Sequence, residues 1–369
     1  MGGWGGMGTA DSVEIYVLTE VKRQCIIKIM DENSTFDQIM TEITSKLTGD
    51  PKVDVKYLME QGEVYKNHNY SKEITRAIGR IIFEIVPDDI RDEFNKVFNN
   101  NNLGIEKVLE EANFQLYEKN WDKALKIIES LIKRIEEMNW YNDDAVSEYH
   151  SFNNFFEEII YKEIFKPSKK IRGIPENYAD VYFKYGIILF ELKKYDEAKN
   201  ALEKANKYNP INVYILFELS EIYKMNKNWD KYLEINKKCL ELAYDSTALA
   251  RCYRNYGFYF VEMDKYEIAT VLFFLSMHFD QNAKIAQSEL LYISQKTGKN
   301  IKQPDAEEIE KILEDIGLKL GANEIILGIA MSIAFEALNK NNNEIAKHFF
   351  EIFYDLTKDE EIKKLIDNI

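Results

Sequence analysis

Length, composition and charge restrict the protein to a few classes. The chain has 369 residues, of which 46% are hydrophobic and 30% are charged, and its formal net charge is −15. This composition is globular, and the length suits two domains or a small domain joined to a repeat array. A strongly acidic chain repels a phosphate backbone, so nucleic acid is not an expected partner.

Cysteine usage and hydropathy favour a cytoplasmic protein. Cys25, Cys239 and Cys252 lie far apart in the chain, which argues against a disulfide framework. No stretch approaches the ~20 apolar residues of a membrane span. The N-terminus also lacks the basic and apolar regions of a secretory signal. We therefore expect a cytoplasmic location without membrane insertion.

The N-terminal part begins with a glycine-rich stretch followed by a hairpin pattern. Residues 1–11 hold five of the 16 glycines and are expected to form a flexible tail. Apolar residues alternate with polar ones at 13–17 and 25–29, which is the pattern of a β-hairpin. Ser34 is then expected to cap a helix that ends before Gly49.

The rest of residues 12–88 completes a small α+β domain. Apolar runs at 55–59 and 80–86 are expected to be strands. The order of strand, strand, helix and closing strands resembles the ubiquitin-like β-grasp fold, and it is similar to the YukD-like domains found alongside bacterial type VII secretion. The resemblance implies a fused protein-binding module. An unrelated small α+β domain is the alternative.

A linker at residues 89–104 leads into residues 105–369, where the hydrophobic period is helical throughout. One segment carries a regular series of large and small residues: Tyr182, Tyr185, Gly186, Leu189, Tyr195, Ala198, Leu202, Ala205 and Pro210. The series resembles the tetratricopeptide repeat (TPR) and recurs from Leu216 and from Tyr253, after steps of 34 and 37 residues.

Weaker copies flank these three repeats, around Trp121 and Ala330, and extra helices are expected at about 143–175 and 282–318. Within the first of these inserts, 143–165 reads as one long helix. We therefore expect a mainly α protein. It consists of a TPR-type α-solenoid of five helical hairpins, preceded by the β-grasp domain.

The resemblance implies a binding groove, because the first helix of each hairpin faces the concave side of such a solenoid. Helical spacing places ten residues there: Phe183, Ile187, Phe190, Tyr214, Phe217, Glu221, Lys224, Arg251, Arg254 and Phe258. These aromatic and charged side chains are candidates for binding a peptide or protein. A second candidate surface lies in the first insert: Tyr149, Asn153, Asn154 and Phe156.

No pattern of residues indicates catalysis. The four histidines are scattered, and no two of them, nor a histidine and a cysteine, have the close spacing of a zinc site. Phosphate-binding and nucleophile motifs are also missing from the sequence. We therefore expect neither an enzyme nor a metal or cofactor.

The sequence favours a non-enzymatic scaffold or adaptor that binds a protein or peptide in the TPR groove. One alternative is a structural component of a bacterial secretion system or another multiprotein assembly, since the first domain resembles modules of that kind. A second alternative is a peptide-sensing regulator. The sequence does not indicate the identity of the partner or the oligomeric state.

Overall fold

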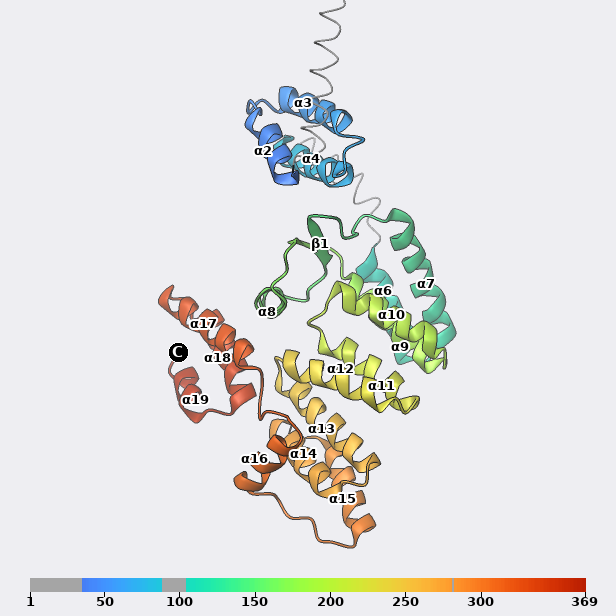
Figure 1. Ribbon diagram of the computed structural model, residues 1–369, viewed down its shortest axis with the longest axis vertical. Coiled ribbons are helices and arrows are strands. Elements are labelled where there is room, and N and C mark those ends of the chain that lie inside the picture. Colours follow the sequence, from blue (N-terminus) through green and yellow to red (C-terminus); the bar gives the residue numbers. More distant parts are fainter. Residues whose placement is uncertain (1–34, 88–103, 281) are drawn as a thin grey trace, which may run out of the picture. The chain divides into compact units, whose positions relative to one another are not determined.

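The computed structural model describes residues 35–87, 104–280 and 282–369. These residues contain 17 helices and only two short strands (Figure 1). They fall into two compact units. The first comprises residues 35–87 with 142–148, and the second comprises 104–141 with 149–369.

Three helices build residues 35–87: α2 (Phe36–Ser45), α3 (Pro51–Val64) and α4 (Ser71–Ile85). Thr35 caps α2 through reciprocal hydrogen bonds with Gln38, and Asp50 caps α3, which begins with Pro51. These signals start each helix at a defined residue. The shared core consists of Ile39, Ile43, Leu58, Tyr65, Ile74 and Ile78.

The ubiquitin-like β-grasp prediction is not supported. The two segments predicted as strands, 55–59 and 80–86, lie within α3 and at the end of α4. The apolar run at 80–86 continues a helical pattern that starts at Ile74 and Ile78, and this longer period decides its conformation. The predicted tail at 1–11 and the strands at 13–17 and 25–29 lie outside the described residues, as does most of the linker.

The remaining elements follow in chain order: α6 (Ile105–Tyr117), α7 (Trp121–Met138), β1 (Ser147–His150), α8 (Phe155–Phe165), β2 (Lys170–Gly173), α9 (Tyr178–Glu191), α10 (Tyr195–Tyr208), α11 (Val213–Met225), α12 (Trp229–Leu242), α13 (Ser246–Glu262), α14 (Tyr266–Phe279), α15 (Lys284–Thr297), α16 (Ala306–Asp315), α17 (Glu324–Asn339), α18 (Asn343–Thr357) and α19 (Glu360–Asp367). The strands β1 and β2 pair with each other.

Five helix pairs share one type of turn: α6 with α7, α9 with α10, α11 with α12, α13 with α14, and α17 with α18. In each turn an amide donates to a carbonyl five residues earlier, as in the 2.8 Å bond from Lys194 to Leu189. The residue before that amide has a positive φ in all five turns: Lys119, Lys193, Lys227, Asp264 and Asn341. This bond pattern ends the first helix of each pair and reverses the chain. These paired hairpins are consistent with a TPR array.

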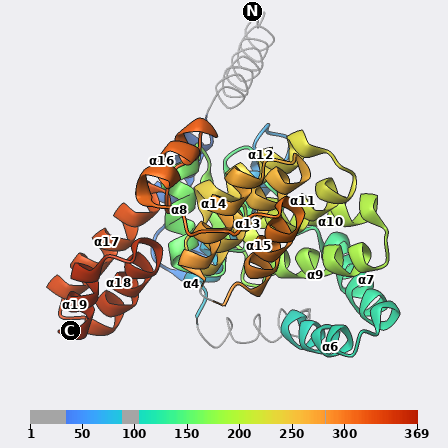
Figure 2. The ribbon, with the colours of Figure 1, turned by 90° about the horizontal axis from the view of Figure 1, so that it is seen from below.

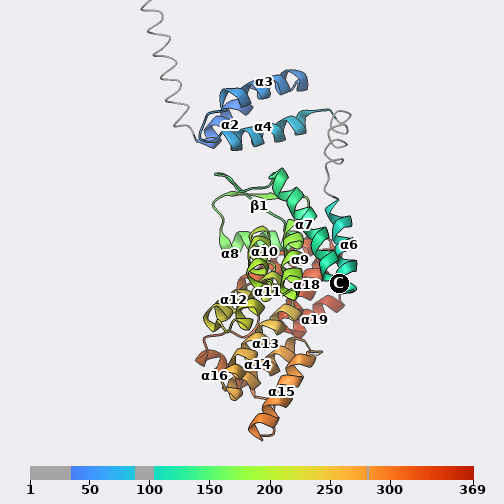
Figure 3. The ribbon, with the colours of Figure 1, turned by 90° about the vertical axis from the view of Figure 1, so that its right-hand side faces the viewer.

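The central hairpins stack in sequence order. Helix α10 packs on α11 and α12 packs on α13, so each second helix contacts the first helix of the next hairpin (Figures 1 and 3). Helix α14 packs in turn on α15. Within hairpins, small residues permit close approach. A Cβ placed on Gly186 would lie 2.5 Å from Cγ of Leu202, and one on Gly257 would lie 2.8 Å from the Phe273 ring. The glycines of the repeat signature are therefore packing residues.

The first insert differs from the prediction. Residues 143–165 are not one long helix, because the chain forms β1 first and α8 begins only at Phe155. Asn154 sets this start: its side chain accepts a hydrogen bond from the amide of Glu157. In the second insert, α15 packs on α14 and α13 as a further first helix, whereas α16 packs on α14.

The C-terminal hairpin does not continue the stack. Helix α17 packs on α8, and α19 packs on α18 (Figure 2). The Phe349 ring of α18 lies 5.6 Å from that of Phe155 and 5.2 Å from that of Phe156. The insert helix therefore connects the C-terminal hairpin to the rest of the second unit. In the parts of the chain that the structure describes, no helix has both the length and the apolar character needed to cross a membrane.

Candidate functional site

The predicted groove residues lie on the first helices α9, α11 and α13, but they differ in exposure. Tyr214 is 38% exposed, whereas Phe217 is fully buried in the core. Phe258 and Arg254 are partly exposed. The predicted face therefore combines exposed side chains, such as Tyr214, with buried ones, such as Phe217, that pack beneath the exposed residues.

Arg251 joins two repeats at the centre of this face. Its Nη2 donates a hydrogen bond to the Glu218 carboxylate at 3.1 Å, from α13 to α11. The same guanidinium lies over the ring of Phe217, 4.5 Å from the ring centroid. The buried phenylalanine thus holds Arg251 in place through a cation–π contact, and Glu218 fixes the direction of the guanidinium.

Tyr214 lies beside this cluster. Its hydroxyl donates to Asp245 at 3.2 Å, and its ring meets that of Phe217 edge to face with centroids 5.9 Å apart. Partial burial, with a smaller contribution from Asp245, raises the pKa of Tyr214 to about 12. The ring is therefore oriented and neutral, and its exposed edge is available to a ligand.

A second cation–aromatic group lies further along the same helices. Lys224 forms an ion pair with Glu221, and its ammonium lies 4.8 Å from the ring centroid of Phe258. Trp229 contacts the same phenylalanine, with centroids 6.5 Å apart. Glu221 and Lys224 therefore neutralise each other, and Phe258 is the apolar member of the group.

Arg254 is the cation on this face that lacks a carboxylate partner among the described residues. Its Nη1 donates to the hydroxyl of Ser276 at 3.2 Å. Burial and the neighbouring Arg251 lower the pKa of its guanidinium, an effect that Asp280 partly offsets. Little negative charge lies close to this partly buried guanidinium, so binding of an anion beside it is favourable.

The α9 end of the face is apolar and packed. Phe183 and Phe190 pack against the core, and the ring of Phe190 lies 5.4 Å from that of Tyr195. Ile187 is partly exposed. The neighbouring Lys184 pairs with Asp180 at 2.9 Å within the same helix. This end therefore offers apolar surface and no free charge.

The second candidate surface is largely internal. Tyr149 and Phe156 are buried. Asn154 is exposed but caps α8, while Asn153 donates from both its amide and its side chain to the buried carboxylate of Glu157. These polar groups form hydrogen bonds within the protein and stabilise the insert, although Asn153 and Asn154 themselves remain exposed.

The same Glu157 carboxylate accepts two further hydrogen bonds, each of 2.8 Å. They come from Asn209, which follows α10, and from the hydroxyl of Tyr244, which follows α12. Proximity to Glu157 adds to burial in raising the pKa of Tyr244. Four donors therefore compensate one fully buried carboxylate, and they attach α8 to two consecutive repeats.

Sequence reasoning missed the continuation of the face onto α15. Ile285 and Tyr292 are 60% and 45% exposed, and they stand 34 residues after Arg251 and Phe258. Met225 of α11 is also exposed at 55%. The repeat length was the available signal, but reading 282–318 as an insert hid it.

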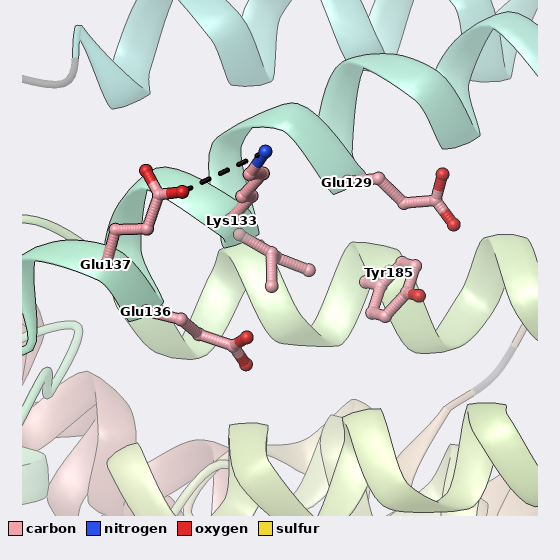
Figure 4. Close-up of a pocket in the computed structure, with 6 residues that line it drawn as sticks. Glu129, Lys133, Glu136, Glu137 and Tyr185 are labelled. Atoms are coloured by element: carbon pink, nitrogen blue, oxygen red, sulfur yellow. Dashed lines mark ion pairs between the residues drawn. The ribbon is translucent and has the colours of Figure 1, made fainter.

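An open cavity of about 390 Å³ lies between α7 and α9, lined by Glu129, Ile132, Lys133, Glu136, Glu137 and Tyr185. Figure 4 shows Lys133 and Glu137 paired on one side, with Glu129 and Tyr185 on the other. Glu136 accepts from Lys204 at 2.6 Å and from the Tyr182 hydroxyl at 3.3 Å. Exposed, paired carboxylates are poor general acids or bases.

In the part of the chain that the structure describes, the other reactive groups do not assemble into a site. Cys239 and Cys252 are buried, and burial raises the pKa of both thiols. Among the described residues, no group of three or more His, Cys, Asp and Glu side chains is arranged to hold a metal ion.

Comparison with known protein families supports a repeat in this unit. A family profile described as tetratricopeptide repeat matches residues 179–212, which cover α9, α10 and the turn after them. No curated protein matches the chain. The matched residues include Gly186 and Ala198, which lie at the close contact between these two helices. The chain therefore contains a tetratricopeptide repeat at residues 179–212, a motif that generally mediates protein–protein interactions.

Proposed function

We propose that the protein is a non-enzymatic adaptor that binds a segment of a partner protein along α9, α11, α13 and α15. The observation that carries the proposal is the partly buried Arg254, which has no ion pair within the described chain and lies one turn from Arg251. Such a guanidinium gains most from a carboxylate supplied by a partner.

The neighbouring side chains define the rest of the partner. Tyr214 and Phe258 flank the two arginines and expose apolar ring surface. Aromatic residues and arginine contribute most of the binding energy at many interfaces, because they bury large areas with little loss of conformational entropy. We therefore expect a segment that has an Asp, a Glu or a C-terminal carboxylate next to an apolar residue.

Charge pairing on this face supports binding over catalysis. Glu218 pairs with Arg251 and Glu221 pairs with Lys224, so two of its carboxylates are already neutralised by cations. A general acid or base needs a pKa near neutrality. Pairing with a cation favours the charged form of a carboxylate and so keeps its pKa low.

A peptide-display selection tests the proposal. Random peptides are selected on the full chain and on the Arg254→Glu variant, with Lys347→Glu as a charge-matched control at an exposed position of α18. We expect Asp and Glu to be enriched next to apolar residues on the wild type and on the control. Arg254→Glu should lose this enrichment and favour Lys or Arg. Identical selections on all three proteins would refute the proposal.

A further inference from the structure

Helix α17 carries an exposed apolar stripe. No charged residue lies between Glu324 and Glu336 in this helix. Ile325 and Phe335 are each 47% exposed, and Gly328 and Ser332 lie between them on the same side and are also exposed. The Phe335 ring packs edge to face on Phe350 of α18, with ring centroids 5.3 Å apart, but about half of the Phe335 surface remains exposed.

We infer that the stripe binds the α17 stripe of a second copy of this chain, in an antiparallel pair. The spacing is self-complementary. In a twofold arrangement centred near Ala330, Ile325 of each copy meets Phe335 of the other, and Gly328 meets Ser332. Large residues then pack against large ones at both ends, while the small residues let the two helices approach closely at the centre.

The charges at the ends of the stripe are compatible with this pairing. Lys319 pairs with Glu324 at 3.6 Å, and Lys340 pairs with Glu336 at 2.5 Å. Each end is therefore neutral, although the whole chain carries −15. In the antiparallel register, Glu336 of one copy faces Glu324 of the other, and each keeps its own lysine, Lys340 or Lys319. Lys340 of one copy then lies one turn from Glu324 of the other and compensates this facing pair of carboxylates.

A cavity at one end of the stripe provides room for the partner's phenylalanine. It has a volume of about 770 Å³ and lies between α12, α14, α18 and the start of α17. Ile325 and Leu320 line it, and Leu320 is 60% exposed. Phe335 of the second copy would lie at the rim of this cavity and cover both residues.

The dimer is expected to be weak. One helix pair buries less than a standard interface, so we expect a dissociation constant on the order of 100 µM. Net charges of −15 repel each other and this repulsion is screened by salt, whereas apolar contacts are not. Association should therefore tighten as salt is raised.

Sedimentation velocity of the full chain over a concentration series tests the inference. Gly328→Gln places a side chain near the centre of the proposed contact between the two α17 helices. A Cβ added to Gly328 would have no other atom of the same chain within 4 Å, so the variant should fold. It should raise the dissociation constant by about tenfold or more, since overpacking separates the helices. Gly79→Gln is the matched control, because Gly79 is also an exposed helical glycine with no atom near its Cβ.

Each other outcome overturns the inference. A wild type that is monomeric at several hundred µM excludes the dimer, and a dimer unaffected by Gly328→Gln uses another surface. A monomer that instead floats with zwitterionic lipid vesicles assigns the stripe to a lipid surface. As a further check, Lys340→Glu should weaken the dimer and addition of Glu324→Lys should restore it, because the crossed ion pair re-forms in reverse.

Discussion

The guanidinium of Arg251 lies between Phe217 below it and Glu218 beside it, 4.5 Å from the ring centroid and 3.1 Å from the carboxylate. This one side chain connects the first helices of two consecutive hairpins. It also brings a positive charge to the centre of a face whose neighbouring cation, Arg254, remains without a carboxylate in the described chain.

A double-mutant cycle measures this connection. Arg251→Ala and Glu218→Ala, separately and together, should give an interaction energy of about 0.5–1 kcal/mol, because both side chains are only partly exposed. Urea unfolding of the four proteins provides the measurement. Additive effects would show that the pair contributes nothing to the stacking of α11 and α13.

Gly186→Ala should destabilise the second unit by about 1–3 kcal/mol, since the new methyl would overlap the Leu202 side chain. Thermal unfolding checks the value. In a Leu202→Ala background the same substitution should cost much less, because the space is then free. An equal cost in both backgrounds would mean that the glycine is required for another reason.

Glu157→Ala should lower stability by about 3 kcal/mol or more, since it leaves the donors of Asn153, Asn209 and Tyr244 unsatisfied in the interior. Hydrogen exchange should show faster exchange in α8. Glu158→Ala is the control: its carboxylate is partly exposed and pairs with Lys162 of the same helix, so its loss should cost about 0.5 kcal/mol. Similar losses in both variants would contradict the role assigned to Glu157.

Stability should fall at alkaline pH. Burial raises the pKa of Tyr141 and of Tyr214 to about 12, whereas tyrosine in an unfolded chain titrates near ~10. The folded protein therefore holds these protons more tightly, and the corresponding stability is complete below about pH 10 and is lost as the pH rises through about 12. Urea unfolding at increasing pH, followed with tyrosinate absorbance, checks this. A flat profile above pH 10 would contradict it.

The repeats could be predicted from sequence because their signature is local. Gly186, Ala198 and Leu202 lie within one hairpin, and their sizes are required by contacts between its two helices. The conformation of residues 80–86 could not be read in the same way. A short run rich in isoleucine fits a strand as well as a helix, and only its continuity with Ile74 and Ile78 identifies α4.

The candidate site was predicted in outline only. Helical spacing placed Phe217 on the groove face, but the ring is covered by Arg251 and so belongs to the core. Conversely, Ile285 and Tyr292 were missed, because whether α15 continues the stack depends on its packing against α14 and α13. Helical spacing in the sequence shows on which face of a helix a residue lies. Whether that residue is exposed depends on packing against helices that are distant in the sequence.

Photo-crosslinking tests the central claim most directly. A photoreactive residue is placed at Tyr214, at the centre of the proposed face, and separately at Tyr117, which is 85% exposed on α6. Each protein is then irradiated in lysate of the source cells. We predict that a specific protein crosslinks from position 214 and not from 117, and that Arg254→Glu abolishes the product. Identical products from both positions, or a product that persists in Arg254→Glu, would contradict binding on this face.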